Sequence, residues 1–201
     1  MLIGLDFDNT IVSYDALFYK VAIEQEIIPP LTAVNKVAVR NYLRGIDKED
    51  QWTEMQGYVY GKRMQEAQPY PGAIEFMSLA KQLGHHLLII SHKTKCPFLG
   101  EKYDLHLSAK EWIKSHLWVD GKPLFSDSDY FFEVTKEDKI NRITDCGCNT
   151  FIDDLPEILL NESFPMNTDR ILFDPENHHS SIDLPELKIK SSWGQISKDL
   201  L

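Results

Sequence analysis

Residues 2–10 read LIGLDFDNT, and this stretch decides the fold class. The run from Leu2 to Phe7 is short and mostly apolar, which is typical of a buried strand, and the polar residues after it are typical of a turn. Asp6 and Asp8 therefore fall at the end of the first predicted strand. Taken alone, this pattern could be a turn with a capping aspartate. A calcium loop is disfavoured because Ile11 stands where that loop needs glycine.

The rest of the chain alternates between helical and strand patterns. Three helices are expected between residues 14 and 68: one opens at Asp15, one is capped by Thr32, and one is capped by Asp47 or Asp50. Further elements are expected as helices over 73–83, 104–116 and 136–144, strands over 87–90, 130–134, 150–152 and 170–173, a surface loop over 176–190 and a terminal helix over 193–201. Alternating helices and continuously apolar strands predict an α/β fold, a Rossmann-like three-layer α/β/α core around a parallel sheet.

Polar side chains follow several of the predicted strands. Parallel sheets place ligand sites beyond the carboxyl ends of their strands, so these residues are expected to share one edge. They are Asp6 and Asp8 after the first strand, Ser91 after the second, Asp153 and Asp154 after a later one, and Lys136 at the start of a helix.

In this order, the residues resemble the motifs of the haloacid dehalogenase-like (HAD) superfamily of phosphohydrolases. The stretch from Asp6 to Thr10 is similar to the first motif, and Ser91 is similar to the second. Lys136 is similar to the third motif and Asp153-Asp154 to the fourth. The resemblance covers nearly the whole chain. It implies a phosphoric monoester hydrolase that forms an aspartyl-phosphate.

The chemistry of the side chains agrees with this implication. Phosphoryl transfer needs a nucleophile, an acid for the leaving oxygen, and positive charge around the phosphoryl oxygens. Asp6 can be the nucleophile, and Asp8 can act first as general acid and then as general base. Ser91 and Lys136 are expected to bind the phosphoryl oxygens.

The third-motif lysine has alternatives. Lys136 is preferred because it begins the predicted helix, with Ile140 and Ile143 spaced as in the family pattern. Lys139 lies one turn further along and roughly on the same helix face, so it is the first alternative. Lys93 is a more distant candidate.

A metal ion is expected in the same site. Hard Mg²⁺ prefers carboxylate and carbonyl oxygens, and converging carboxylates repel one another without a cation. The resemblance implies that Asp6, the backbone carbonyl of Asp8, and the Asp153-Asp154 pair bind Mg²⁺. It favours Asp154 as the direct ligand, and Asp153 either as a ligand through water or as a residue that supports the ligands without binding the ion.

The composition limits the partners and the compartment. A net charge of −10 argues against a nucleic-acid partner, because binding phosphate backbones needs clustered lysine and arginine. No apolar run is long enough to span a bilayer, and the N-terminus has no signal-peptide pattern, so a cytoplasmic location is expected. The three cysteines are odd in number and low in density, which indicates reduced thiols rather than a disulfide framework.

The expected domains are a core over 1–13 and 69–201 and a helical segment over 14–68. In the family, that position holds a helical cap, which implies a small substrate such as a sugar phosphate or a nucleotide. The function predicted is a Mg²⁺-dependent phosphatase acting on a small phosphate monoester. A phosphotransferase such as a phosphomutase and a non-catalytic relative that binds a phospho-ligand or a partner protein are the alternatives.

Overall fold

The computed structural model describes residues 1–179 and 181–201, and the chain forms two compact units. The core unit comprises Met1–Val12, Pro69–Lys93 and Leu117–Leu201, and the helical unit comprises Ser13–Gln68 and Thr94–His116. The chain crosses between the units after Lys93, after His116, and within the short strands β2 (Val12–Ser13) and β3 (Gln68–Pro69), which pair with each other.

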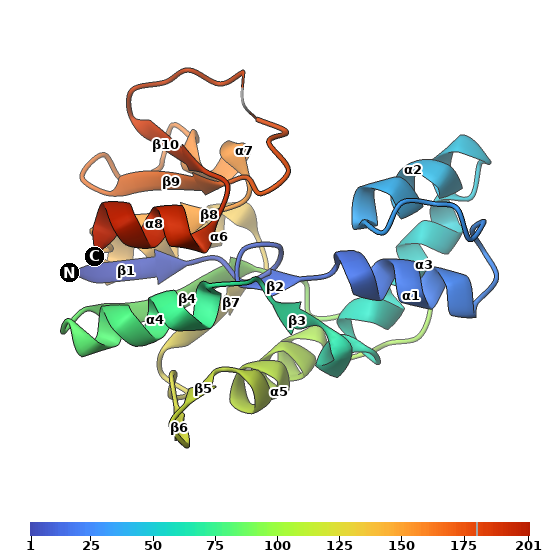
Figure 1. Ribbon diagram of the computed structural model, residues 1–201, viewed down its shortest axis with the longest axis horizontal. Helices are drawn as coiled ribbons and strands as arrows, with labels where there is room; N and C mark the ends of the chain where they lie inside the picture. The colour runs from blue at the N-terminus through green and yellow to red at the C-terminus, as the bar shows by residue number, and fades with distance from the viewer. Residues whose placement is uncertain (180) are drawn as a thin grey trace. The chain divides into compact units, whose positions relative to one another are not determined.

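The core unit is built on one six-stranded sheet, ordered β10-β9-β8-β1-β4-β7, and all its described pairings are parallel (Figure 1). β1 lies inside the sheet between β4 and β8, so the strand that leads to the two aspartates is paired along both edges. The strands are β1 (Leu2–Leu5), β4 (His86–His92), β7 (Tyr130–Glu133), β8 (Thr150–Asp153), β9 (Asp169–Phe173) and β10 (Leu187–Lys190).

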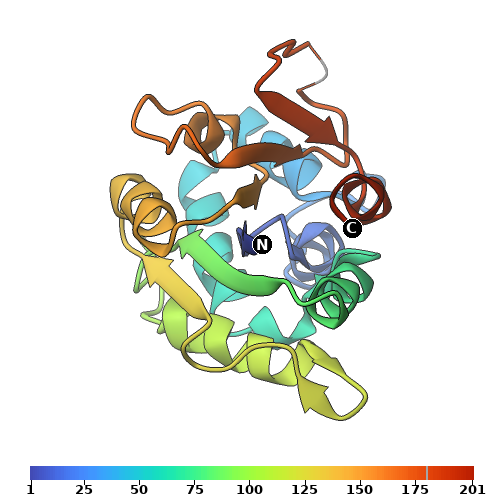
Figure 2. The same cartoon turned by 90° about the vertical axis from the view of Figure 1, so that its left-hand side faces the viewer.

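Helices cover both faces of this sheet. Figure 2 shows α4 (Ala73–Gln82) and α8 (Trp193–Leu200) on one face, and α6 (Lys136–Cys146) and α7 (Pro156–Leu159) on the other. A hairpin of β5 (Trp118–Val119) and β6 (Lys122–Pro123) completes the unit. The predicted three-layer α/β/α class is therefore confirmed.

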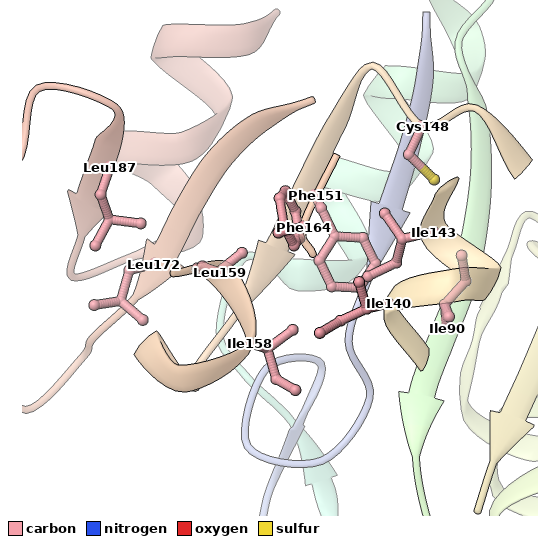
Figure 3. Packing of buried hydrophobic residues seen from close by; sticks show 10 residues of the cluster. All are labelled: Ile90, Ile140, Ile143, Cys148, Phe151, Ile158, Leu159, Phe164, Leu172 and Leu187. Carbon is pink, nitrogen blue, oxygen red and sulfur yellow. The ribbon is translucent and has the colours of Figure 1, made fainter. Parts of the chain in front are cut away.

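Hydrophobic side chains join α6 and α7 to the sheet (Figure 3). Ile140 and Ile143 lie one turn apart on α6, so both reach the same side of the helix, which faces the sheet. The buried members of this cluster are Ile90, Ile140, Ile143, Cys148, Phe151, Ile158, Leu159, Phe164, Leu172 and Leu187. The packing fixes the rotation of α6, and with it the direction of the lysines on that helix.

The predicted helices over 136–144 and 193–201 are present in the core unit as α6 and α8. The Thr135 hydroxyl accepts the backbone N–H of Asp138 at 3.0 Å, which caps the start of α6, and it donates to the Asp138 carboxylate at 2.7 Å. The terminal helix α8 docks through Trp193, whose buried ring packs against Phe76 and Phe173.

The C-terminal tail differs from its prediction. Residues 176–190 were expected to be surface loop, but Leu187–Lys190 forms the edge strand β10, paired with β9. Leu187 is buried and Ile189 is partly buried, while Lys188 is exposed. Alternating lysines made this stretch look polar, although a strand at a sheet edge needs apolar residues on one face only. Residue 180, within the same predicted loop, lies outside the described residues.

The helical unit contains α1 (Asp15–Glu24), α2 (Lys36–Gly45), α3 (Glu49–Tyr60), the 3₁₀ turn η1 (Met64–Glu66) and α5 (Leu105–His116). Two predicted caps were wrong. Asn35, not Thr32, caps α2, because its side chain accepts the Ala38 N–H at 2.6 Å. Asp47 has a left-handed φ of 57° and turns the chain before α3, and Asp50 lies within the first turn of that helix.

Residues 94–116 also differ from the predicted division, which placed them in the core. They pack with the helical unit because small residues on α3 admit close contacts. A Cβ built on Gly57 would lie 2.6 Å from Pro97, and one on Gly61 would lie 2.4 Å from Tyr103. The indole N–H of Trp112 also donates to the Ala67 carbonyl at 2.9 Å. Contacts between segments far apart in sequence carry no local pattern.

Replacing Gly4 by alanine is expected to destabilise the core unit by about 1–3 kcal/mol, because overpacking a well-filled core forces neighbours to move. The new Cβ would lie 2.4 Å from the Phe151 ring and 3.0 Å from the Cys148 sulfur. Urea unfolding measures the effect. Gly45→Ala, in α2, is the control, since nothing lies within 4 Å of that Cβ. If Gly4→Ala and the native chain had the same free energy of unfolding, the claim that Phe151 and Cys148 leave no room for a side chain at residue 4 would be wrong.

Candidate active site

Three neighbouring strands bring the predicted polar residues to one edge of the sheet. β1 ends at Leu5, and the next backbone N–H, that of Asp6, donates to the Ile152 carbonyl of β8 at 2.8 Å. Asp153 is the last residue of β8, and Ser91 lies near the end of β4 on the other side of β1. Asp6, Ser91 and Asp153 are all buried. The expected convergence at the carboxyl ends of the strands is therefore present.

Lys139 connects two of these carboxylates. Its ammonium nitrogen lies 2.6 Å from Asp6 Oδ1 and 2.6 Å from Asp153 Oδ2, and its side chain is 1% exposed. Burial disfavours the charged ammonium, but the Asp153 and Asp6 carboxylates outweigh that cost and raise the pKa of Lys139. The site therefore contains a permanent positive charge beside Asp6.

Lys136, the preferred lysine of the sequence analysis, does not reach this site. It pairs with Glu157, and both side chains are about half exposed. The reason is the rotation of α6. Because the apolar residues of that helix fix which side faces the sheet, Lys139 extends into the site, while Lys136 in the first turn extends to the surface. The alternative, Lys139, thus occupies the expected place.

Asp6, Asp153 and Asp154 form the one candidate metal cluster among residues 1–179 and 181–201. Each offers a carboxylate oxygen within 4.8 Å of the others. Asp153 also accepts the Leu155 N–H at 3.0 Å. Burial raises the pKa of Asp153 to about 7, although Lys139 opposes this shift. Clustered carboxylates in a buried place fit a hard divalent cation, which would favour their ionised forms.

Asp8 has a lysine partner of its own. Lys93 Nζ lies 2.6 Å from one Asp8 oxygen and 2.9 Å from the other. Asn9 follows in the left-handed region, with φ 60°, and its N–H donates to the Val12 carbonyl at 2.9 Å, which closes the turn after β1. Lys93 was only a distant candidate for the third-motif lysine, and the structure pairs it with Asp8 rather than Asp6.

His92, between Ser91 and Lys93, was not singled out from the sequence. Its Nε2 lies 3.1 Å from the Val134 carbonyl, and burial lowers its pKa, with Lys139 adding to that effect. The only signal for it was its place at the end of a strand that also carries Ser91 and Lys93.

Solved structures with a similar fold are numerous. No protein-family model matches the sequence, and no curated protein matches it significantly. A predicted phosphatase from Clostridium acetobutylicum aligns with a TM-score of 0.60 and 15% identity over 99% of this chain and 97% of that one. A HAD-superfamily hydrolase from Ehrlichia chaffeensis aligns with a TM-score of 0.52 and 13% identity over 98% and 94%.

The chain has a HAD-like fold. A predicted phosphoglycolate phosphatase from Haemophilus somnus 129pt supports the same conclusion, with a TM-score of 0.57 and 16% identity over 100% of this chain and 97% of that one. The resemblance inferred from the motifs is thus confirmed at the level of the fold.

Within the HAD-like fold, most of the predicted site residues gather at one edge of the sheet. Asp6, Ser91 and Asp153 lie at or next to the carboxyl ends of neighbouring strands, and Asp154 joins the carboxylate cluster. Asp8 lies two residues after Asp6, in the turn that follows β1. Lys136 is outside the site. Lys139 and Lys93 contribute its two buried ammonium groups.

Proposed function

We propose that this chain is a Mg²⁺-dependent phosphatase that hydrolyses a small phosphate monoester through an aspartyl-phosphate on Asp6. The observation that carries the proposal is the buried Lys139 ammonium, 2.6 Å from both Asp6 and Asp153. A protein with a net charge of −10 needs such a placed cation to accept a phosphoryl group beside a carboxylate. The same charge then stabilises the oxygens of the transition state.

In the first half-reaction, an Asp6 oxygen bonds to phosphorus as the bond from phosphorus to the ester oxygen breaks. Asp8 in its acid form gives its proton to that oxygen, so that an alcohol leaves and Asp8 becomes a carboxylate. Ser91 donates a hydrogen bond to a phosphoryl oxygen, and Lys139 donates to another while it offsets their negative charge.

In the second half-reaction, a water oxygen bonds to phosphorus and the bond from phosphorus to the Asp6 oxygen breaks. The Asp8 carboxylate takes the proton of the attacking water, and inorganic phosphate leaves. Asp6 returns as a carboxylate and Asp8 returns as an acid, so both residues are ready for another cycle. The net change is the hydrolysis of one ester bond.

Asp6, the Asp8 backbone carbonyl and Asp154 would bind the Mg²⁺ ion directly, with Asp153 acting through water. When bound, such an ion neutralises phosphoryl oxygens and orients the phosphate. The fit rests on the three carboxylates with oxygens within 4.8 Å of one another. The preference for Asp154 over Asp153 agrees with the partners of Asp153, whose two oxygens already receive Lys139 and the Leu155 N–H.

The similar structures support a phosphate chemistry for this site. Two of them are predicted phosphatases, and a HAD family hydrolase from Deinococcus radiodurans, with a TM-score of 0.55 and 10% identity, contains bound phosphate and sodium. The position of residues 14–68, inserted between β1 and β4, supports a role as a cap that admits small substrates such as sugar phosphates or nucleotides.

Metal removal tests this function. Phosphate release from p-nitrophenyl phosphate is expected to require Mg²⁺, to stop with EDTA and to return when Mg²⁺ is added in excess. In Asp154→Asn, the Mg²⁺ concentration for half-maximal activity is expected to rise by at least about tenfold, because a ligand oxygen is replaced by a weaker one. Asp145→Asn, at an exposed residue of α6, removes the same charge and is the control. Turnover that EDTA leaves unchanged would contradict the proposal.

A further inference from the structure

Lys93 is a buried cation of the site that has no role in the mechanism described above, and it is paired with Asp8. Lys93 approaches both oxygens of the Asp8 carboxylate, at 2.6 and 2.9 Å. The Lys93 side chain is 4% exposed, and that of Asp8 is 21% exposed. The pair therefore sits at the boundary of the site, with the lysine buried and the carboxylate partly accessible.

Several contacts hold both the backbone and the ammonium group of Lys93 in place. Its backbone N–H donates to the Glu133 carbonyl of β7 at 2.8 Å, directly after the end of β4. Its ammonium lies 5.6 Å from the centroid of the Phe7 ring, which packs edge-on against Phe132. A lysine held at both ends loses little further freedom when it binds a carboxylate, so it can hold that carboxylate in one orientation.

The two buried lysines of the site pair with different carboxylates. Lys139 binds Asp6 and Asp153, whereas Lys93 binds Asp8. Lys139 is thus placed against the residue that attacks phosphorus, and Lys93 is placed against the residue that handles protons. An ammonium that contacts both oxygens of a carboxylate restricts the directions in which that carboxylate can point. Lys93 therefore sets the direction in which the Asp8 oxygens face the site.

We propose that Lys93 is a positioning residue that orients the Asp8 carboxylate as the base for the second half-reaction. The inference rests on the proposed phosphatase function. In this step the water oxygen bonds to phosphorus, the bond between Asp6 and phosphorus breaks, and the proton of the water moves to the Asp8 oxygen. Lys93 acts on the reaction through its contact with Asp8.

A pre-steady-state experiment separates this role from a general loss of activity. Lys93→Met keeps the long apolar stem and removes the ammonium. With p-nitrophenyl phosphate and Mg²⁺, it is expected to release a burst of about one nitrophenol per site, because the leaving group needs no acid. The steady rate that follows is expected to be lower than that of the native protein by about 10²-fold. Acid-quenched samples should contain accumulated phosphoprotein.

Two further variants complete the design. Lys93→Arg can contact both Asp8 oxygens with its guanidinium, so it is expected to recover at least about tenfold of the steady rate and to accumulate less phosphoprotein than Lys93→Met. Lys136→Met removes an ammonium from an exposed pair with Glu157 and should behave as the native chain. If Lys93→Met does not fold, Lys93→Gln replaces it with the same expected burst.

The possible failures have different signatures. A native chain without turnover or phosphoprotein would contradict the proposed function, and this inference with it. An active native chain, together with a Lys93→Met variant that shows no burst and no accumulated phosphoprotein, would overturn the inference alone. That result would mean that Lys93 affects both half-reactions or only the folded structure.

Discussion

Asp6→Asn is expected to lower phosphate release by at least about 10⁴-fold, because the variant lacks the oxygen nucleophile that begins the reaction. The amide is close in size to the carboxylate, and it can still accept a hydrogen bond from Lys139, which lies 2.6 Å from the native oxygen. Steady-state kinetics with p-nitrophenyl phosphate and Mg²⁺ measures the loss.

The control for this variant is Asp145→Asn, which makes the same chemical change at an exposed position of α6. It should leave both the rate and the stability unchanged within measurement error. Thermal unfolding of Asp6→Asn shows whether the variant is folded under the assay conditions. A folded Asp6→Asn protein with native turnover would rule out Asp6 as the nucleophile.

Lys139→Met is expected to lower kcat by about 10³-fold, the effect of removing a preorganised donor to the transition state. It should also destabilise the core unit by about 3–5 kcal/mol, because the buried Asp6 and Asp153 lose the cation that compensates their charge. Kinetics and urea unfolding, both performed with and without Mg²⁺, measure the two effects.

Lys136→Met is the matched control for Lys139→Met, since both lysines lie on α6 and differ by one turn. Lys136 pairs with Glu157 at the surface, so its loss should cost no more than about 1 kcal/mol and leave kcat unchanged. A larger kinetic effect at residue 136 than at residue 139 would show that Lys136 is the lysine that serves the phosphoryl group.

Much of the fold followed from local patterns in the sequence. Apolar runs ended by polar residues located five of the six strands of the sheet, and a parallel sheet requires that such ends meet at one edge. This geometric rule is why Asp6, Ser91 and Asp153 could be predicted to converge before any coordinates. The Thr135 cap depends on residues only three positions apart, so it is a short-range feature of the sequence.

The errors have a common physical origin in contacts that are distant in sequence. Lys136 and Lys139 both fit a helix start, and only the packing of Ile140 and Ile143 against the sheet decides which lysine enters the site. The Asp8–Lys93 pair joins residues 85 positions apart, and nothing near Lys93 in the sequence indicates its partner.

The boundaries of the units show the same effect. Residues 94–116 join the helical unit through close contacts at Gly57 and Gly61, which sequence patterns cannot specify. Strand β10 was missed because an edge strand can be half lysine and still pair. Among residues 1–179 and 181–201, no helix has the length and apolar character needed to cross a bilayer.

The most direct test of the mechanism is chemical trapping of the intermediate. Native protein is mixed with p-nitrophenyl phosphate and Mg²⁺, quenched, and treated with borohydride, which reduces an acyl phosphate of aspartate to homoserine. Peptide mass spectrometry then locates the modified residue. Homoserine at position 6, absent when substrate is omitted, is the predicted result. Homoserine at position 8 or at another aspartate, or none at any position during measurable turnover, would contradict an aspartyl-phosphate on Asp6.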